Sequence, residues 1–365
     1  MVKAWRLFAL VFAAAFSLSA CGREPEGAGT APHIRWRAEQ EGALLIRTNT
    51  SMLGPVIDAF RAQYPKVEIR LEDMNSTMLA SNVVADVLAG RPGADLVWSS
   101  AMDVQIKLIN DGYAQTYKSP HRRAMPDGMV WRDQGFGITS EPVVFAYNRR
   151  LLPPALTPNS HADLIRLLET RPEIFDGHMA VYDAEQSGVA LMQLSSDTQI
   201  YPDAWRMMEA LGSRKPRLDT SGQRMMWRLA TGQTLFVFNM NQSYGQTWVR
   251  DHPDIALVTP TDYHLLVSRV AFIPSNAAHP NAARLFLDFL LSREGQAAVA
   301  KAGMRPARDD VDPALLRPSP PGARPIRVGP GLLANLDYER REKLLGRWRS
   351  AMEGAPRAPL DPHAP

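Results

Sequence analysis

The chain has 365 residues, of which 45% are apolar and 22% are charged, and these values are ordinary for a globular protein. This length predicts two lobes or domains rather than one small core. The single cysteine, Cys21, excludes a disulfide framework within one chain. The net charge of +3 falls to +1 without residues 1–20, and no basic stripe with interleaved aromatic residues appears, so we expect no nucleic-acid partner.

The first twenty residues differ from the rest of the chain. Lys3 and Arg6 precede an apolar run, 7–16, and small residues follow up to Ala20. This pattern is typical of a secretory signal peptide over 1–20, and a short membrane anchor is the alternative. The stretch "LSAC" resembles the bacterial lipobox, in which the cysteine, here Cys21, becomes the lipidated first residue. Residues 21–42 are then expected to form a lipid-attached flexible tether.

After the tether, strand-like and helix-like segments alternate, which predicts an α/β fold with helices covering its sheets. The predicted strands and extended segments are 44–46, 67–71, 94–100, 136–152, 178–182, 234–241 and 264–276. The predicted helices are 53–63, 77–90, 101–114, 160–172, 188–194, 201–213, 221–232, one long helix over 281–303, and 337–352. A run rich in Pro and Gly over 317–331 breaks the pattern, and 353–365 is expected to be a disordered tail.

Small polar residues stand between a strand and the next helix at five places, and we interpret these as candidate ligand contacts. In open α/β sheets, ligands lie beyond the carboxyl ends of the strands, where helix N-termini favour anions. For any single loop, plain helix capping is the simpler explanation, because Ser, Thr, Asn and Asp are preferred N-caps. The loop residues are Asn49, Thr50 and Ser51; Asn75 and Ser76; Ser99 and Ser100; Ser187 and Gly188; and Ser221 and Gly222.

Two segments resemble bacterial periplasmic (type 2) solute-binding proteins of ABC-transporter type. "NAARLFLDFLLSREGQ", 281–296, resembles a helix signature found near their C-terminal end, and "EPVVFAYNRRLL", 141–152, resembles their crossing segment. The lipobox fits as well, because many of these receptors are lipid-tethered. The resemblance covers roughly 43–310 and is strongest to the branch that contains ferric-iron, thiamine and phosphorylated-compound binders.

That resemblance implies a two-lobed periplasmic-binding-protein-like fold with crossing strands that form a hinge and a ligand cleft between the lobes. Lobe 1 is expected over 43–138 plus 265–310, and lobe 2 over 139–264. A C-terminal linker and helix would occupy 311–352. The protein is expected in the periplasm as a membrane-anchored lipoprotein.

Further candidate ligand residues follow from the same resemblance and from residue chemistry. Iron binders of this branch hold the metal with two adjacent tyrosines after a strand and an asparagine. The matching run here is Asn239, Met240, Asn241 and Gln242, with amides at both tyrosine positions and Tyr244 as the only nearby phenol. Neutral amides suit oxyanions or hydroxyls better than ferric iron, so we expect no metal and no cofactor.

Charged residues near the expected lobe crossings are candidates for holding an anion or a hydroxyl. Any of Arg47, Arg149 and Arg269 could clamp an anion, although each could equally face solvent. Ser140 and Glu141 lie near the expected hinge, and Glu141 could accept a hydrogen bond from a ligand or form a hinge salt bridge. Trp98 could stack on a ligand ring or belong to the core.

The function implied is an extracytoplasmic receptor that captures a small polar, anionic metabolite, phosphorylated or carboxylated, for an ABC importer. An alternative is a ligand sensor that regulates a membrane histidine kinase, because "VGPGLLANLDYERREKLLGRWRSAM" resembles the end of phosphoglycerate-type regulatory binders. A ferric-iron binder is less favoured. No common catalytic motif appears, and Ser187 lacks the glycines of a nucleophile elbow, so no enzymatic activity is expected.

Overall fold

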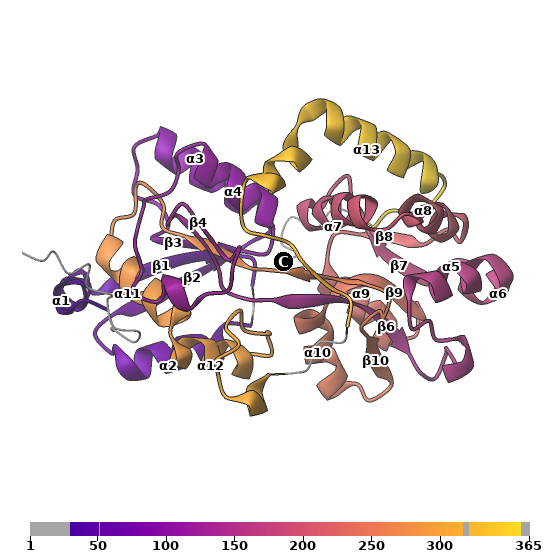
Figure 1. Ribbon diagram of the computed structural model, residues 1–365, viewed down its shortest axis with the longest axis horizontal. Coiled ribbons are helices and arrows are strands. Elements are labelled where there is room, and N and C mark those ends of the chain that lie inside the picture. The colour runs from indigo at the N-terminus through magenta and orange to yellow at the C-terminus, as the bar shows by residue number, and fades with distance from the viewer. Residues whose placement is uncertain (1–29, 51, 317–320, 359–365) are drawn as a thin grey trace, which may run out of the picture.

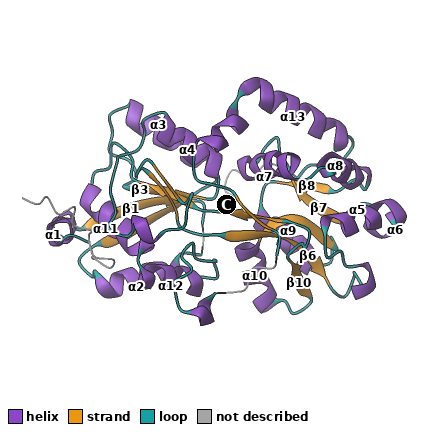
Figure 2. Ribbon diagram, viewed as in Figure 1, coloured by secondary structure: helices purple, strands orange, loops and turns teal. Residues whose placement is uncertain are grey.

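The computed structural model describes residues 30–50, 52–316 and 321–358, and Ser51 and Cys21 lie outside these ranges. Two sheets stand side by side, each flanked by helices (Figures 1 and 2). Each sheet has its own buried apolar cluster. We call the two halves lobe 1 and lobe 2. The α/β, two-lobed class predicted from the sequence is confirmed.

Lobe 1 is built on a six-stranded sheet in the order β2-β1-β3-β12-β5-β4. β1 is parallel to both of its neighbours, whereas β12 runs antiparallel to β3 and to β5. Its strands are β1 (Ala43–Thr48), β2 (Glu68–Asp73), β3 (Leu96–Ser99), β4 (Val130–Trp131), β5 (Gly135–Gly137) and β12 (Val270–Phe272). Its helices are α1 (Pro32–Glu41), α2 (Gly54–Gln63), α3 (Ser76–Leu88), α4 (Met102–Asn110), α11 (Pro280–Leu291) and α12 (Arg293–Lys301).

Lobe 2 is built on a seven-stranded sheet in the order β13-β11-β6-β9-β7-β8, with β10 also paired to β6. Its strands are β6 (Glu141–Asn148), β7 (Met179–Tyr182), β8 (Arg217–Asp219), β9 (Phe236–Asn241), β10 (Ile255–Val258), β11 (His264–Val267) and β13 (Ala323–Pro325). Its helices are α5 (His161–Thr170), α6 (Pro172–Phe175), α7 (Gly188–Ile200), α8 (Ala204–Ser213), α9 (Gly222–Ala230) and α10 (Gln242–Asp251).

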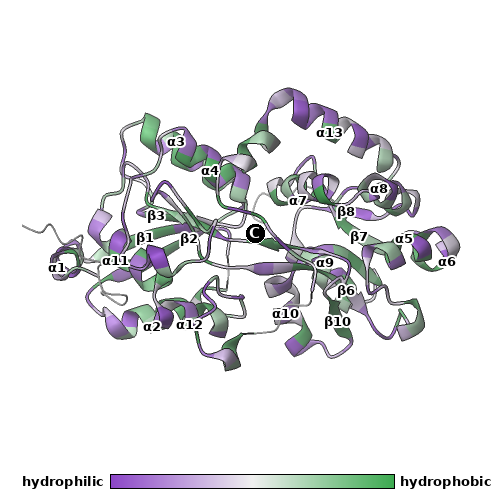
Figure 3. Ribbon diagram, in the orientation of Figure 1, coloured by the Kyte–Doolittle hydropathy of each residue, from purple (hydrophilic) through white to green (hydrophobic). Residues whose placement is uncertain are grey.

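The apolar residues gather on the strands and on the helix faces that cover them, and polar residues dominate the outer helix surfaces (Figure 3). Both β1 and β9 are almost wholly buried, which matches their nearly continuous apolar sequence. Within the described residues, no helix has both the length and the apolar character that crossing a membrane requires.

The chain crosses between the sheets through two adjacent segments. One joins β5 to β6 through 138–140, and the other joins β11 to β12 through Ser268 and Arg269. They are held together because the Ile138 amide donates to the Arg269 carbonyl over 2.9 Å and the Arg269 amide donates to the Thr139 hydroxyl over 2.9 Å. The crossing therefore places Arg269 and Glu141 at the junction of the two lobes.

Two expectations about helices need correction. The tether expected up to residue 42 is wrong for 32–41, because α1 forms there and buries Ile34 and Ala38 beside α11. The long helix expected over 281–303 is two helices. Ser292 is extended between them and accepts a hydrogen bond from the Gly295 amide, which caps α12. A Cβ atom on Gly295 would overlap the carbonyl oxygen of Phe289, so the sharp turn requires glycine.

The C-terminal segment 323–358 joins both lobes, and we call it the strap. Its β13 extends the lobe 2 sheet beside β11, and its Val328 and Leu332 then enter the lobe 1 core. A short 3-10 helix (Pro330–Leu336) leads into α13 (Tyr338–Ala351), whose Leu345 and Trp348 belong to the lobe 2 core. Figure 1 shows α13 lying over α7 and α8.

The disordered tail expected from residue 353 is wrong for its first residues. The Leu218 amide of β8 donates to the Pro356 carbonyl over 2.9 Å, and the Ala358 amide donates back to Leu218 over 2.8 Å. The end of the strap is therefore paired with the edge of the lobe 2 sheet. Composition misled the prediction because the free edge of β8 supplies the hydrogen bonds that the tail itself lacks.

Candidate ligand-binding cleft

Arg269 is the central charged group between the lobes. Its side chain is 1% exposed, and its Nε donates to Oε1 of Glu141 over 2.8 Å. Burial alone would lower the pKa of Arg269, but the nearby Glu141 and Tyr244 raise it above its ordinary value. The guanidinium is therefore charged at every physiological pH. The salt bridge at the hinge, one of the two roles considered for Glu141, is present.

Arg269 also contacts both lobes. Its Nη1 donates to the Thr50 hydroxyl of lobe 1 over 2.6 Å, and its Nη2 donates to the Ser243 hydroxyl of lobe 2 over 3.2 Å. Its guanidinium carbon lies 5.0 Å from the centre of the Tyr244 ring. The lobes are thus closed on each other, with one buried cation linking them.

The loops of lobe 1 that end β1 and β3 are tied together. The Asn49 Nδ2 donates to the Ser100 hydroxyl over 3.0 Å, and the Ser100 amide donates to Asn49 Oδ1 over 3.1 Å. The Ser99 hydroxyl accepts from the Ala101 amide, as in an ordinary turn before a helix. β1 and β3 are parallel neighbours, so their carboxyl ends bring these side chains to the same edge.

Helix N-termini from lobe 2 converge on the same region. Ser243, which contacts Arg269, lies in the first turn of α10. Gly188 begins α7, and a Cβ atom there would be 3.6 Å from Val104 in the first turn of α4. Gly222 begins α9, and a Cβ atom there would be 2.5 Å from the Tyr182 hydroxyl, so Gly222 allows that ring to approach.

Ser187 and Ser221 act as helix caps, which was the simpler explanation considered for each loop. The Ser187 hydroxyl accepts from the Ala190 amide over 3.3 Å, and the Ser221 hydroxyl accepts from the Arg224 amide over 3.2 Å. Asn241 Oδ1 accepts from the Gln193 side chain of α7 over 3.0 Å. These bonds fix the walls of the cleft around Tyr182, whose pKa is raised by burial.

Some predicted residues lie away from this cluster. Asn75 caps α3 by accepting from the Met78 amide, with Ser76 as the first helical residue, and the pair is only partly buried. Gln242 lines a separate hollow of about 50 Å³ with Arg305. The 5% exposed Ser140 lies in the crossing segment and contacts Arg305 through its main chain.

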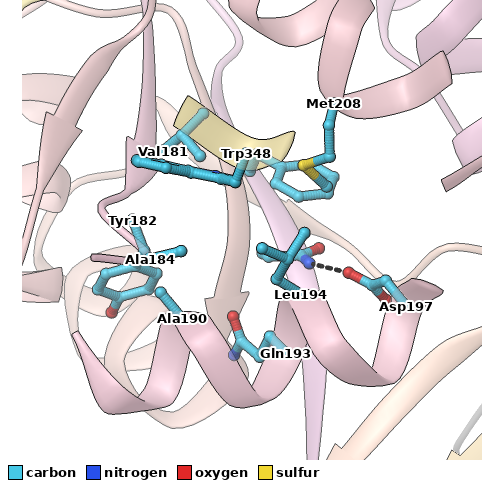
Figure 4. Close-up of a pocket in the computed structure, with 11 residues that line it drawn as sticks. Val181, Tyr182, Ala184, Ala190, Gln193, Leu194, Asp197, Met208 and Trp348 are labelled. Atoms are coloured by element: carbon cyan, nitrogen blue, oxygen red, sulfur yellow. Dashed lines mark hydrogen bonds between the residues drawn. The ribbon is translucent and has the colours of Figure 1, made fainter. Parts of the chain in front are cut away.

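Asn239 faces the interior of lobe 2. Its backbone φ is +55°, and its Nδ2 donates to Asp197 Oδ2 over 2.9 Å. Figure 4 shows the small hollow beside it, with Asp197 on one side and Trp348 of the strap on another. Tyr182 and Gln193 line the same hollow as Asn239.

The other three side chains considered as ligand contacts do not contact Arg269. Arg47 forms ion pairs with Glu72 over 2.7 Å and with Asp86 over 3.0 Å. Arg149 is exposed, and Trp98 is fully buried in the lobe 1 core. Of the three arginines, only Arg269 lies in the cleft.

Sequence reasoning missed Ser243, Tyr182 and Gln193. Ser243 directly follows Gln242, and Tyr182 ends a strand, so both carried the same strand-end signal as the residues that were named. Asp103 in α4 is fully buried, and its Oδ2 has no hydrogen-bond partner among the described residues. Burial raises the pKa of Asp103 to about 6. Glu141 Oε2 is likewise buried without a partner within the described ranges.

Metal ligation has no obvious basis in the described part of the chain. There, no group of three or more His, Cys, Asp or Glu side chains is arranged to hold a metal ion. The positive charge of Arg269 beside Tyr244 would repel a ferric ion, and burial raises the pKa of Tyr182, which disfavours a tyrosinate ligand there.

Several solved structures resemble this chain over most of its length. The substrate-binding protein of the ABC transporter from Agrobacterium tumefaciens is 30% identical over 85% of this chain and 94% of that chain, with a TM-score of 0.80. Iron-bound HitA from Pseudomonas aeruginosa is 20% identical over 85% of this chain and 99% of its own, with a TM-score of 0.65. AfuA from Actinobacillus pleuropneumoniae, with fructose-6-phosphate bound, is 19% identical over 86% and 99%, with a TM-score of 0.67.

The last two likenesses show the fold alone. No curated protein matches the chain. Residues 56–321 match the family described as bacterial extracellular solute-binding protein, which covers more than half of the sequence. The resemblance seen in the crossing segment and in the helical signature is thereby confirmed, and the chain belongs to the bacterial extracellular solute-binding proteins.

Proposed function

We propose that this protein captures a small polar anion in the cleft around Arg269 and delivers it to the membrane permease of an ABC importer. The observation that carries the proposal is the burial of Arg269 between hydroxyl groups of both lobes. Each hydroxyl accepts from the guanidinium and keeps a proton that can be donated to an anion. Because a phosphate or carboxylate would contact both lobes at once, its binding would favour closure.

The ligand should also carry a hydrogen-bond donor. Glu141 Oε2, on the carboxylate that pairs with Arg269, is a buried acceptor that no described residue satisfies. Leaving a buried acceptor unsatisfied is unfavourable, and a ligand hydroxyl or amine would relieve that penalty. A hydroxylated or amino-substituted anion, phosphorylated or carboxylated, therefore fits this cleft better than a simple inorganic anion. The N-termini of α4, α7, α9 and α10 add favourable partial positive charge.

We favour the importer over the alternative of a sensor for a histidine kinase. The structural relative from Agrobacterium tumefaciens serves an ABC transporter and shares 30% identity over most of both chains. The sensor alternative was suggested by the sequence at the C-terminal end, which lies in the strap. The strap packs into the cores of both lobes, so a structural role explains its sequence without a kinase partner. We also propose that the protein works outside the cytoplasm, anchored by lipid on Cys21.

A thermal-shift screen followed by calorimetry tests the ligand class. Phosphorylated sugars, phosphoglycerates, hydroxy acids and amino acids should include at least one compound that raises the melting temperature, because a ligand that prefers the folded protein stabilises it. Neutral sugars are the comparison. A response to neutral sugars alone would contradict the proposed anion.

Variants then test the place of binding. Thr50→Val combined with Ser243→Ala removes one hydroxyl from each lobe and should weaken the selected anion by roughly 10- to 150-fold or more, as expected for lost hydrogen bonds to a charged group. The matched control is Thr77→Val with Ser350→Ala, which removes a hydroxyl from α3 and one from α13 outside the cleft. If the two double variants bind the anion with the same affinity, the ligand does not bind between Thr50 and Ser243.

A further inference from the structure

A second, larger hollow lies outside the Arg269 cleft, where the strap passes the hinge. It has a volume of about 570 Å³, which is within the range of small-molecule sites. We call it the strap groove. Its walls come from β4 of lobe 1, from the last part of α7 and from β11 of lobe 2, and from residues 324–332 of the strap. None of the polar residues around Arg269 lines it.

The strap groove is positively charged. Arg324 and Arg327 line it, and neither forms an ion pair with any described residue. None of the residues that line the groove is acidic. The guanidinium of Arg132 lies 4.4 Å from the centre of the Trp131 ring, but Arg132 does not line the groove. Two arginines without ion pairs in its walls, and no acidic residue beside them, favour an anionic occupant.

Arg327 is held in place by the backbone beneath it. Its side chain passes 3.0 Å from the position that a Cβ atom of Gly128 would take, so no other residue fits there without moving the guanidinium. Gly128 also has a φ of +81°, which other residues rarely adopt. The Val328 amide donates to the Gly128 carbonyl over 2.7 Å, which fixes the strap against lobe 1.

The remaining walls are apolar and in part aromatic. Trp131 is half-buried, and Ile200 at the end of α7 is 40% exposed, an unusual position for a large apolar side chain. Leu265 and Leu332 are buried at the base. A flat apolar group could lie against Trp131 while its acidic group meets the arginines.

We propose that the strap groove is a second ligand site, which takes an organic anion with a flat or apolar body. Its walls belong to both lobes and to the strap, so a bound molecule would contact all three and stabilise their present arrangement. The site is separate from the cleft proposed for the transported solute and does not depend on that proposal.

The test uses two probes, 4-fluorobenzoate and 4-fluorophenyl phosphate, observed by fluorine NMR as the purified protein is titrated. At least one should bind saturably at millimolar concentrations or below. Arg324→Gln combined with Arg327→Gln should weaken it about tenfold or more, as expected for lost charge-assisted hydrogen bonds. Ile200→Glu should weaken it as well by placing a negative charge at the wall. These side chains are all exposed, so the variants should fold.

Matched controls separate the groove from general surface charge. Arg37→Gln combined with Arg217→Gln removes two exposed arginines that make no ion pair with described residues, and Leu88→Glu adds a charge at a 76% exposed position. These variants should bind the probes like the parent protein. The proposal is overturned if neither probe binds saturably, if the groove variants bind as the controls do, or if Ser243→Ala abolishes binding while the groove variants do not.

Discussion

The Tyr244 hydroxyl in α10 of lobe 2 donates a hydrogen bond of 3.1 Å to the main-chain carbonyl of Asn49 in lobe 1. The same hydroxyl lies 3.5 Å from Nη1 of Arg269, which donates toward it. The hydrogen bond from Tyr244 to Asn49 therefore joins the two lobes directly beside Arg269, the residue that should bind the ligand. It is therefore a natural place to alter closure without removing the cleft itself.

We expect Tyr244→Phe to shift the ligand-free protein toward an open arrangement. Losing a hydrogen bond of about 0.5–1.5 kcal/mol changes the ratio of closed to open molecules by about 2- to 12-fold. Energy transfer between dyes on cysteines placed at the exposed positions Arg37 and Glu173, with Cys21 replaced by Ser, would report the change. Tyr338→Phe, at a 77% exposed position, is the control, and equal transfer in both variants would argue against the closing role.

The sequence predicted the fold well because its apolar periodicity is strong. Strand-like runs around Ile46 and Val237 and the amphipathic stripes of the helices follow from local composition, and they became buried strands and covering helices. The break at Ser292 was missed because the apolar stripe continues across it. The ordering of 32–41 and 353–358 depends on partners distant in the chain, α11 and β8, which local pattern does not reveal.

The candidate cleft was predictable only in part. Polar residues at the ends of parallel strands identified Asn49, Thr50 and Ser100, because parallel strands share one carboxyl edge. Which arginine enters the cleft could not be read from charge alone. Arg47 lies within β1 and Arg269 lies between β11 and β12, yet Arg47 pairs with Glu72 and Asp86, whereas Arg269 pairs with Glu141. The direction of each side chain depends on the strand pairing.

Asp103→Asn should stabilise the protein at neutral pH. Burial raises the pKa of Asp103 to about 6 in the folded state, from 3.8. A carboxyl with a raised pKa supports folding while it is protonated, and this support is lost as the pH rises from about 4 through about 6. The asparagine does not ionise, so the variant should gain up to about 3 kcal/mol above pH 7.

Urea unfolding at several pH values measures this gain. The difference between Asp103→Asn and the parent protein should vanish below about pH 4, where both side chains are neutral. Asp58→Asn, at an exposed position in α2, should show no comparable dependence. A gain that is constant with pH would mean that packing, not ionisation, is responsible.

Trp348→Ala should weaken lobe 2 and release the strap. Trp348 is 1% exposed and lies over Val181 and Met208 (Figure 4), so truncation leaves a large cavity in a packed core. Such changes cost about 3–5 kcal/mol. Hydrogen exchange should then quicken in α13 and in β8, to which the end of the strap is paired, more than in β1. Trp36→Ala, at a 61% exposed position in α1, should leave these rates unchanged.

Cys21→Ser should prevent lipid attachment. The cysteine lies outside the described residues, so this prediction rests on the apolar run and the "LSAC" stretch before it. Metabolic labelling with a fatty-acid analogue should mark the parent protein but not the variant, and the variant should appear in the soluble or unprocessed fraction. Intact mass showing an unmodified Cys21 in the mature parent protein would contradict lipid anchoring.

Variants of the Arg269–Glu141 pair can distinguish the contribution of the Arg269 charge to folding from its contribution to ligand binding. Arg269→Met alone leaves Glu141 buried and unpaired, which should cost about 3–5 kcal/mol of unfolding free energy. Adding Glu141→Leu removes the uncompensated carboxylate and should restore most of that loss, because buried ion pairs are often no more stabilising than apolar replacements.

Ligand binding should not return with stability in that double variant. If Arg269 holds the anion, Arg269→Met/Glu141→Leu should be folded by urea unfolding and yet give no heat of binding with the anion selected by the thermal-shift screen. Glu141→Gln, which keeps the shape of the side chain and the cation, serves as the control and should retain measurable binding to the anionic group. An Arg269→Met/Glu141→Leu protein that is stable and binds the anion at parental affinity would show that Arg269 only holds the hinge together, and the anion site would then have to be sought elsewhere in the molecule.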